Sequence, residues 1–545
     1  MGTIWMGGTI YTMKQELDMV EAVYTEKGTI KDAGKLDELE QRYGKPGIEF
    51  VDLQGGVMFP GWVDSHMHLI GHGETFLKLQ LGGCTSREEL LEAIRIQTEL
   101  LPEGMWVIGE GWNENDWENA LLPEREQLDL AAPRHPVLLR RVCRHVIVVN
   151  SAALQAAGVN ESNPGVSRGI LGRNADGELN GILKEQAQEF VLSAVPGVTE
   201  EYLETALTAA IEDCWAKGLT GCHTEDLSYY GSCDRVMSAF HKVLNEKQMH
   251  FRAHLLVHHL ALNEWLEEDK GKHYQSPLLE FGAMKLFADG ALGGRTALLS
   301  RPYADDPSTS GVAVHSDEEL EQLVIEARKH GMAVASHAIG DGAAEKVLRN
   351  LEKYPCPKEK RDRLIHGQIL RPELVEQMKR MPVITDIQPS FVASDFPWVM
   401  DRIGEPGSLL VYAWKTLLQE GISCAGGSDA PIEKVSPLEG IHAAVTRTKL
   451  HQQTVYGEKE QLSMYEAMSL YTKGSAYAIG HEGDRGIIEK EFAADFTILK
   501  HDPFKEGPDI LLQDLVQMTV VNGEIVYNKN RDYILKIQHM KNSQQ

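Results

Sequence analysis

Two histidines, His66 and His68, are the first residues along this chain whose spacing suggests chemistry. They end an apolar run in the segment FPGWVDSHMHL, and on an extended strand residues i and i+2 point to the same face. Two imidazole nitrogens placed in this way can bind one metal ion. The pair is weak evidence by itself, because 21 histidines in 545 residues produce an H-x-H pattern about once by chance.

Four further polar residues stand at the ends of apolar runs: Lys285 in MKLFADG, His337 in AVASHAIGDG, His366 in LIHGQ and Asp429 in AGGSDAP. In a barrel of parallel strands, catalytic groups from distant parts of the chain meet at the carboxyl ends of the strands. An ordinary strand-end residue that bonds the backbone is the alternative for each of them. That alternative explains any one position, but it explains the whole set poorly.

These residues need strands to position them, and the chain between residues 56 and 479 supplies eight buried candidates. They are Val63–His66, Leu219–His223, Arg252–Val257, Ala283–Ala288, Met332–His337, Arg363–His366, Val383–Gln388 and Ile422–Gly427. Helical patterns such as SDEELEQLVIEARKHG separate most of them, which favours parallel βα units in an α/β protein. Eight units predict a (β/α)8 barrel, with an open doubly wound sheet as the alternative.

Both ends of the chain have a different pattern from the middle. Residues 1–55 and 480–530 alternate short period-two runs with glycine turns, and Asn522-Gly523 is typical of a tight hairpin. We expect the two ends to build one small β domain, followed by a polar tail at 531–545. About 150 residues separate the first barrel strand from the second, so residues 75–210 are interpreted as an inserted subdomain that covers the site.

Composition excludes several classes of protein. Lys and Arg number 54 against 80 Asp and Glu, a net charge of −26, and such a surface repels nucleic acids and anionic membranes. Seven scattered cysteines without a C-x-x-C pair suit a reducing compartment, and neither a signal peptide nor a membrane span is apparent. We therefore expect a cytoplasmic protein that acts on a small molecule, as a monomer or a homo-oligomer.

The chain resembles the amidohydrolase superfamily, in the amidohydrolase-3 branch that includes N-substituted formamide deformylases. The resemblance extends from about residue 50 to residue 525. It rests on the ordered blocks PGWVDSHMH, GEGWNENDW, RRVCRHVIVVNSAAL, DGELNGILKE, MKLFADGALGGRT, SHAIGDGA, LIHG, GGSDAP and EKEFAADFTIL. It implies a distorted (β/α)8 TIM-like barrel, a flanking small β-sandwich from both chain ends, and a divalent metal site, usually Zn²⁺, with one or two ions per chain.

The resemblance also implies a role for each candidate ligand. His66 and His68 would bind one metal ion, and Asp429 would bind the same ion and act as the proton shuttle. His337 and His366 would bind a second ion. Activated water attacking a carbonyl carbon is the chemistry that such a site supports.

Lys285 falls where many relatives carry a carboxylated lysine, whose carbamate offers two anionic oxygens to metal ions. An unmodified lysine paired with Asp289 is the alternative. The expected reaction is hydrolysis of a C–N bond in a small amide, N-acyl or N-formyl compound by metal-activated hydroxide. Two alternatives remain. One is hydrolysis of a C–O bond in a lactone, ester or carbamate at the same site, and the other is a catalytically inert barrel that acts as a binding or scaffold protein.

Six residues are candidate substrate contacts: Arg295, His145, Trp112, Trp117, Phe391 and Trp398. Arg295 could hold a carboxylate or carbonyl oxygen, or else bond a neighbouring loop acid. His145 matches a histidine of the family. The four aromatic residues could line a pocket, although packing explains them at least as well.

The pair Cys143-Arg144 departs from the Asp-Gly that we expect at this point of the family pattern. The change adds a cation near the predicted mouth of the barrel, which would favour an acidic substrate. His223, Glu225 and the doublet His258-His259 end other strands, and we interpret them as supporting or packing residues.

Overall fold

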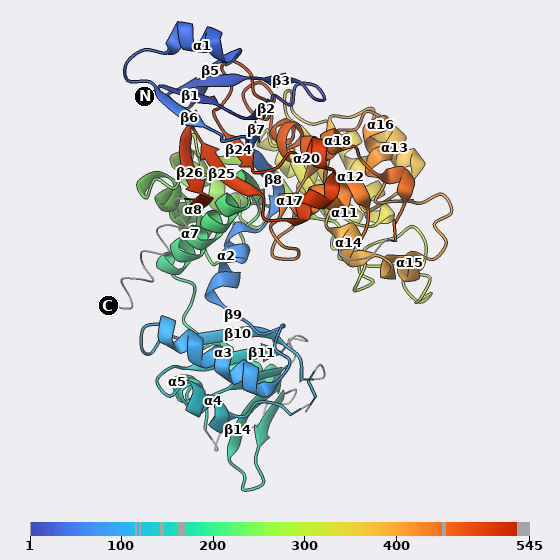
Figure 1. Cartoon of the computed structure of the whole chain (residues 1–545). Helices are drawn as coiled ribbons and strands as arrows, with labels where there is room; N and C mark the ends of the chain where they lie inside the picture. Colours follow the sequence, from blue (N-terminus) through green and yellow to red (C-terminus); the bar gives the residue numbers. More distant parts are fainter. Residues whose placement is uncertain are drawn as a thin grey trace. The chain divides into compact units, whose positions relative to one another are not determined.

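The computed structural model describes residues 2–114, 117–118, 121–141, 146–160, 169–449 and 454–530. The chain forms two units, one of Met1–Gly71 with Leu203–Gln545 and one of His72–Tyr202 (Figure 1). Cys143-Arg144, His145 and the tail at 531–545 lie outside the described residues. Among the residues described, no helix has both the length and the apolar character that crossing a membrane requires.

The eight predicted strands are the strands of one parallel sheet, in the order β23-β21-β19-β18-β17-β16-β15-β8. The bounds of these strands are β8 Trp62–Met67, β15 Leu219–Thr224, β16 Arg252–His258, β17 Leu279–Phe287, β18 Val334–Ala338, β19 Asp362–His366, β21 Val383–Ile387 and β23 Cys424–Gly426. The predicted boundaries differ from these by a few residues at most, except at β17, which begins four residues earlier than predicted.

Contacts between the two edge strands, β8 and β23, bend this sheet into a nearly closed barrel. The backbone N–H of Asp429 donates to His66 O over 2.8 Å. The buried Asp64 carboxylate accepts the N–H of Ser428, at 3.0 and 3.1 Å, and the N–H of His66, at 3.0 Å. Because these bonds join the first strand to the last, they exclude the open doubly wound sheet.

Helices connect successive strands, as the periodicity predicts. Their bounds are α7 Glu200–Ala216, α8 Cys233–His241, α11 Asp317–Lys329, α12 Asp341–Lys353, α13 Pro372–Met378, α16 Trp414–Gln419 and α17 Pro437–Thr446. Helix α11 begins with a capping box, in which Ser316 and Glu319 each accept the backbone N–H of the other. It buries Leu320, Val324 and Ala327, whose spacing of four and three places them on one face.

The barrel interior contains charge as well as apolar side chains. Small and branched residues such as Leu256 and Ala335 pack together there. Beside them the Arg363 guanidinium donates to both oxygens of Asp386, at 2.7 and 2.8 Å, and to Ser65 O at 2.6 Å. This buried pair ties β19 and β21 to β8 across the barrel.

Strands from the two ends of the chain build two sheets in the same unit, and both ends contribute strands to one of them. One sheet has the order β5-β4-β1-β6 and the other β26-β25-β24-β7-β2-β3. Their bounds are β1 Gly2–Met6, β2 Thr9–Tyr11, β3 Met19–Val20, β4 Ala22–Glu26, β5 Thr29–Gly34, β6 Glu49–Asp52, β7 Val57–Pro60, β24 Phe496–Leu499, β25 Val516–Val521 and β26 Glu524–Asn528. Trp5, Met58 and Phe496 are part of one core that draws on both sheets. Asn522 and Gly523 both have positive φ, as the tight hairpin between β25 and β26 requires.

The second unit, His72–Tyr202, has a sheet of its own in the order β13-β14-β12-β11-β10-β9. Its strands and helices are β9 Leu79–Gln80, β10 Val107–Trp112, β11 Val137–Arg141, β12 Val146–Val149, β13 Gly169–Arg173, β14 Leu179–Glu185, α3 Arg87–Leu100, α4 Arg125–Ala131 and α5 Ser151–Ala156. Leu90 and Ile94 of α3 pack with Leu128 of α4 and Val137 of β11 in a separate core.

An ion pair joins the barrel strand β16 to Asp495, the residue that precedes β24 of the terminal sheets. Arg252, at the start of β16, donates to both oxygens of Asp495, at 2.5 and 3.1 Å, and only 12% and 10% of the two side chains are exposed. Asp495 also accepts the N–H of Asn522 over 2.7 Å. Removing one partner of such a pair leaves the other charge buried and uncompensated.

We predict that Arg252→Ala lowers the free energy of unfolding by about 3 kcal/mol, because Asp495 loses its counter-charge in a buried site. Urea denaturation followed by circular dichroism measures the change. Lys272→Ala is the matched control, since Lys272 and Asp269 are 76% and 70% exposed and such pairs contribute about 0.5 kcal/mol. Equal losses in the two variants would contradict the assignment.

Candidate metal centre

The barrel collects the predicted ligands at the carboxyl ends of its strands. His66 lies near the end of β8, Lys285 near the end of β17, His337 in β18 and His366 at the end of β19. Asp429 follows β23 by three residues. Since all these strands are parallel, the side chains share one rim although they are up to 363 residues apart in the sequence, between His66 and Asp429.

Three of the predicted ligands lie close enough to share one ion. Among the described residues, His66, His366 and Asp429 form a group whose potential ligand atoms all lie within 4.8 Å of one another, and all three residues are buried. Asp429 Oδ1 lies 3.5 Å from His66 Nε2 and 3.5 Å from His68 Nε2. Imidazole and carboxylate groups in this arrangement fit a divalent transition-metal ion.

Hydrogen bonds on the far side of two rings set their orientation. His68 Nδ1 donates to Glu225 O over 2.9 Å, and His366 Nδ1 donates to Gln388 Oε1 over 2.7 Å. Each bond holds its ring with Nε2 facing the cluster. Metal-binding histidines commonly have a partner of this kind on their other nitrogen.

His337 stands beside His366, with ring centroids 4.5 Å apart. Its Nε2 donates to Gly290 O over 3.1 Å and lies 3.5 Å from Asp289 Oδ1. The nitrogen left to bind a cation is therefore Nδ1, whereas for His366 it is Nε2.

Burial keeps most of these rings in the form that binds metal. Removing the rings from water disfavours their charged form and lowers the pKa of His66, His337 and His366. The positive charge of Lys285 lowers the pKa of these rings further. A neutral imidazole has a lone pair to offer, so these three rings need release no proton on binding a cation.

His68 and Asp429 form a charged pair within the cluster. Burial lowers the pKa of His68, but the hydrogen bond to Asp429 and the charges of Asp429 and Glu225 raise it more, to about 9. Burial likewise raises the pKa of Asp429, and the bond to His68 and the neighbouring cations lower it below its usual value. A divalent cation would take the place of the His68 proton in this pair.

Lys285 pairs with Glu225, and the pairing with Asp289 considered from the sequence is wrong. Lys285 Nζ lies 3.5 Å from Glu225 Oε2 and 3.3 Å from His66 Nε2, and 1% of the lysine side chain is exposed. Asp289 instead accepts three backbone N–H groups from the loops that follow β17 and β18. Burial lowers the pKa of Lys285, although the carboxylate of Glu225 opposes this effect.

The aromatic candidates in the barrel unit differ in their distance from the cluster. Phe391, in α14 (Phe391–Asp395), stacks on His366 with ring centroids 6.1 Å apart. Trp398, in α15 (Trp398–Ile403), donates from Nε1 to Ser394 O and lies beside the Arg402 guanidinium. Phe391 is therefore the aromatic candidate in direct contact with a predicted ligand.

Arg295 bonds a neighbouring loop acid, which was the alternative to substrate binding. Its Nε and one terminal nitrogen donate to Asp305, at 3.1 and 2.9 Å, and Arg402 bonds the same carboxylate. An arginine occupied in this way has fewer donors left for a substrate.

The structure gives Trp112 and Trp117 a packing role. Both indoles are buried in the core of the second unit, and Trp117 Nε1 donates to Cys84 O over 2.8 Å. Aromatic rings enclosed by a core stabilise the unit that contains them. His145, the remaining candidate, lies outside the described residues.

Sequence reasoning missed some of the groups that position the ligands. Asp64 was not singled out, although it precedes His66 by two residues, so the period of two already places both on one face of the strand. Gln388 ends the run of β21 as His366 ends that of β19, and the same strand-end signal could have found it. No sequence pattern connects Glu225 to Lys285, because sixty residues separate them.

The other histidines considered from the sequence lie at different levels of the barrel. His258 contacts the region of the cluster, with Nε2 3.9 Å from Glu225 Oε1 and its ring beside those of Tyr229 and Phe287. His223 instead faces His254 across the strand pair β15–β16. Glu225 thus supports the cluster, whereas His223 belongs to a separate group.

Comparisons with known proteins agree with this geometry. The chain is 53% identical to "Putative amidohydrolase YtcJ" of Bacillus subtilis (strain 168), over 97% of this chain and 100% of that protein. It is 25% identical to the N-substituted formamide deformylase of Arthrobacter pascens, over 96% of this chain and 98% of that one. An uncharacterized metal-dependent hydrolase from Pyrococcus furiosus matches with a TM-score of 0.77 at 28% identity, over 93% of this chain and 100% of that structure.

The model of the amidohydrolase family matches residues 49–527, which contain every predicted ligand. The match and the relatives support hydrolase activity and a divalent metal ion. The chain belongs to the amidohydrolase family.

Proposed function

We propose that this chain is a metal-dependent hydrolase that cleaves the C–N bond of a small amide, N-acyl or N-formyl compound. The observation that carries the proposal is the buried group of His66, His366 and Asp429 at the carboxyl rim of the barrel. The likeness to a protein named as an N-substituted formamide deformylase supports the choice of a C–N bond.

The proposed ligands are His66, His68, His337, His366 and Asp429. A divalent cation, Zn²⁺ as the first choice for an imidazole-rich site, supplies a Lewis acid that polarises a carbonyl oxygen and makes water more acidic. Carboxylated Lys285 is a further proposed ligand, because its Nζ is buried 3.3 Å from His66 Nε2.

Asp429 is the residue proposed to move the proton. One of its oxygens lies 3.5 Å from Nε2 of both His66 and His68, so the carboxylate lies beside two of the proposed metal ligands. A lowered pKa keeps it ionised and able to accept a proton. It would take the proton from the attacking water and deliver it to the leaving nitrogen, which otherwise departs as an unstable anion.

We predict that the protein accelerates the hydrolysis of N-formyl or N-acyl amines, relative to the uncatalysed reaction, more than that of esters with the same acyl group. An amide needs its nitrogen protonated as it leaves and an ester oxygen does not, so a site built around a proton shuttle gains more on amides. A panel of paired amides and esters, followed by chromatography of the released acid, measures kcat/KM for both. Each value is divided by the rate constant of the uncatalysed reaction, and a larger acceleration of the esters throughout would favour the C–O alternative.

We predict that Asp429→Asn retains the fold and loses about 100- to 10,000-fold in kcat on the best substrate of that panel, since general acid–base catalysis supplies rates of this size. Circular dichroism checks the fold. Asp306→Asn is the matched control, because Asp306 is a loop acid whose side chain accepts hydrogen bonds from the N–H and hydroxyl groups of Ser308 and which is not a proposed metal ligand. Full activity of the Asp429→Asn variant would reject this carboxylate as the shuttle.

We predict one or two equivalents of a divalent transition metal per chain, measured by plasma mass spectrometry, and a clear loss of metal in His366→Ala. His442→Ala is the matched control, a buried histidine that contacts Thr446 and Asp509. Protein prepared with isotopically labelled bicarbonate shows a carbamate resonance if Lys285 is carboxylated, and none if it is not. Purified protein that holds clearly less than one equivalent of metal, and that stays inactive when divalent metal is added, would support the inert barrel.

A further inference from the structure

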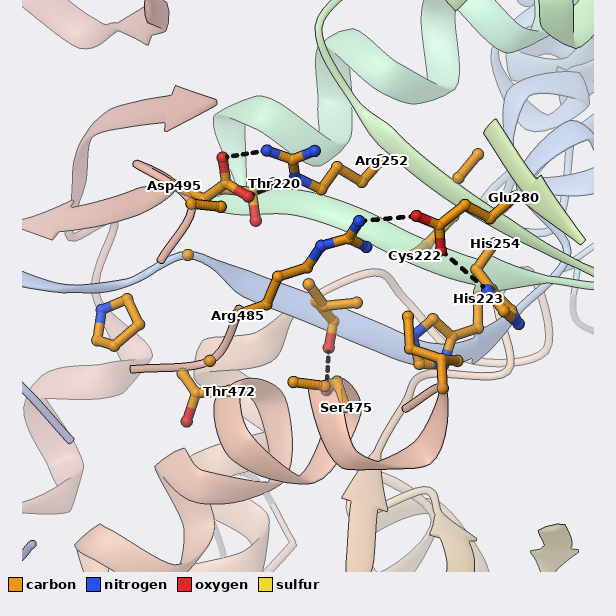
Figure 2. A pocket seen from close by; sticks show the side chains of 18 of the residues that line it. Thr220, Cys222, His223, Arg252, His254, Glu280, Thr472, Ser475, Arg485 and Asp495 are labelled. Carbon is orange, nitrogen blue, oxygen red and sulfur yellow. Dashed lines mark hydrogen bonds and ion pairs between the residues drawn. The ribbon is translucent and has the colours of Figure 1, made fainter. Parts of the chain in front are cut away.

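A small cavity lies where β8, β15, β16 and β17 begin, at the opposite end of the barrel from the metal ligands. Figure 2 shows side chains that line it. Its volume is about 30 Å³. The polar side chains that line it include His223, His254, Glu280, Arg252, Arg485 and Asp495. None of these residues belongs to the proposed metal site, so the cavity is a separate feature of the same unit.

His223 is a buried side chain whose two ring nitrogens both lack a hydrogen-bond partner among the described residues. Only 1% of this residue is exposed. In the described part of the chain, no group lies within hydrogen-bond distance of either ring nitrogen. Burial and the charge of Arg363 lower the pKa of His223, so the neutral ring carries one donor and one acceptor. Buried polar atoms in native proteins are nearly always bonded, by protein or by water.

A chain of contacts leads from His223 toward the outside of the barrel. The ring of His254 lies across from it, with centroids 5.3 Å apart. His254 Nδ1 lies 3.5 Å from Glu280 Oε2, and the same oxygen lies 3.0 Å from His481 Nε2. A Cβ at Gly282 would lie 1.9 Å from His254 Nε2, so this glycine leaves the room that the His254 ring occupies.

The charges around the cavity are already matched. Arg252 bonds Asp495, and Arg485 donates to Glu280 over 2.7 Å, as Figure 2 shows. The two guanidinium groups disfavour a cation in the cavity, and the two carboxylates disfavour an anion. An occupant should therefore be neutral, able both to donate and to accept, and small enough for about 30 Å³. Water meets all three conditions, since one molecule needs roughly 10–15 Å³ of such space.

We propose that this cavity is a binding site for one or two ordered water molecules, which bond the ring of His223 and connect it to His254 and Glu280. The waters complete a polar connection from the barrel interior to His481, which is partly exposed. The assignment is independent of the proposed hydrolase function, because it needs neither a metal ion nor a substrate.

A high-resolution crystal structure of the full chain, purified with its metal, tests the assignment directly. We expect one or two peaks of density in the cavity at about 2.7–3.2 Å from the ring nitrogens of His223, without anomalous signal at the zinc edge. A second crystal under xenon should show no xenon there, because xenon enters dry apolar cavities. An empty cavity, a xenon peak or an anomalous metal peak would each overturn the proposal.

His223→Leu tests whether this ring holds the water. Leucine removes both bonding atoms at similar size, so the peaks should disappear while the side chains of His254 and Glu280 stay in place. His442→Leu, a buried histidine far from the cavity in the sequence and outside its lining, should leave the peaks unchanged. Peaks that persist in His223→Leu would overturn the role of the ring, and the wild-type crystal decides the site even if that variant fails to fold.

Discussion

The structure depends on the contact between the first and last strands of the barrel. There the Asp64 carboxylate accepts the N–H groups of both His66 and Ser428, and Asp429 N donates to His66 O. A buried carboxylate in this position costs free energy unless it is bonded, and burial raises the pKa of Asp64 to about 7. The same bonds that close the sheet place Asp429 beside the two histidines of β8, so barrel closure and assembly of the site are one event.

Much of the fold could be predicted because its signals are local. Predicted runs of four to six residues marked every strand of the barrel, and the alternation of strands and helices indicated parallel order. The start of β17 was predicted four residues too late, because polar Glu280 interrupts the apolar pattern of its first residues. The strand count predicted a closed barrel and left an open sheet as the alternative. Closure depends on side-chain bonds such as Arg363 to Asp386 and Ser65, which no periodic pattern records.

The ligands of the site were predictable where they lie at the ends of predicted strands. His66, His366 and Asp429 each follow an apolar run, and the barrel brings them together. Glu225 beside Lys285 was not foreseen, because partners in a barrel interior are determined by strand order and register, which are properties of the whole sheet. Arg295 was a candidate substrate contact, yet its guanidinium bonds Asp305. A charged residue near a site pairs with the opposite charge that its own loop provides, and the sequence does not show which of the two it will bind.

The sheet order of the terminal strands also bears on how the chain is made. Strand β7 lies between β2, which is synthesised before it, and β24, which follows more than 400 residues later. At translation rates of about 5–20 residues per second, β7 waits roughly 20 to 90 s with one edge unpaired. An open edge is a template for pairing with another chain, so nascent copies on neighbouring ribosomes are exposed to mispairing during this interval.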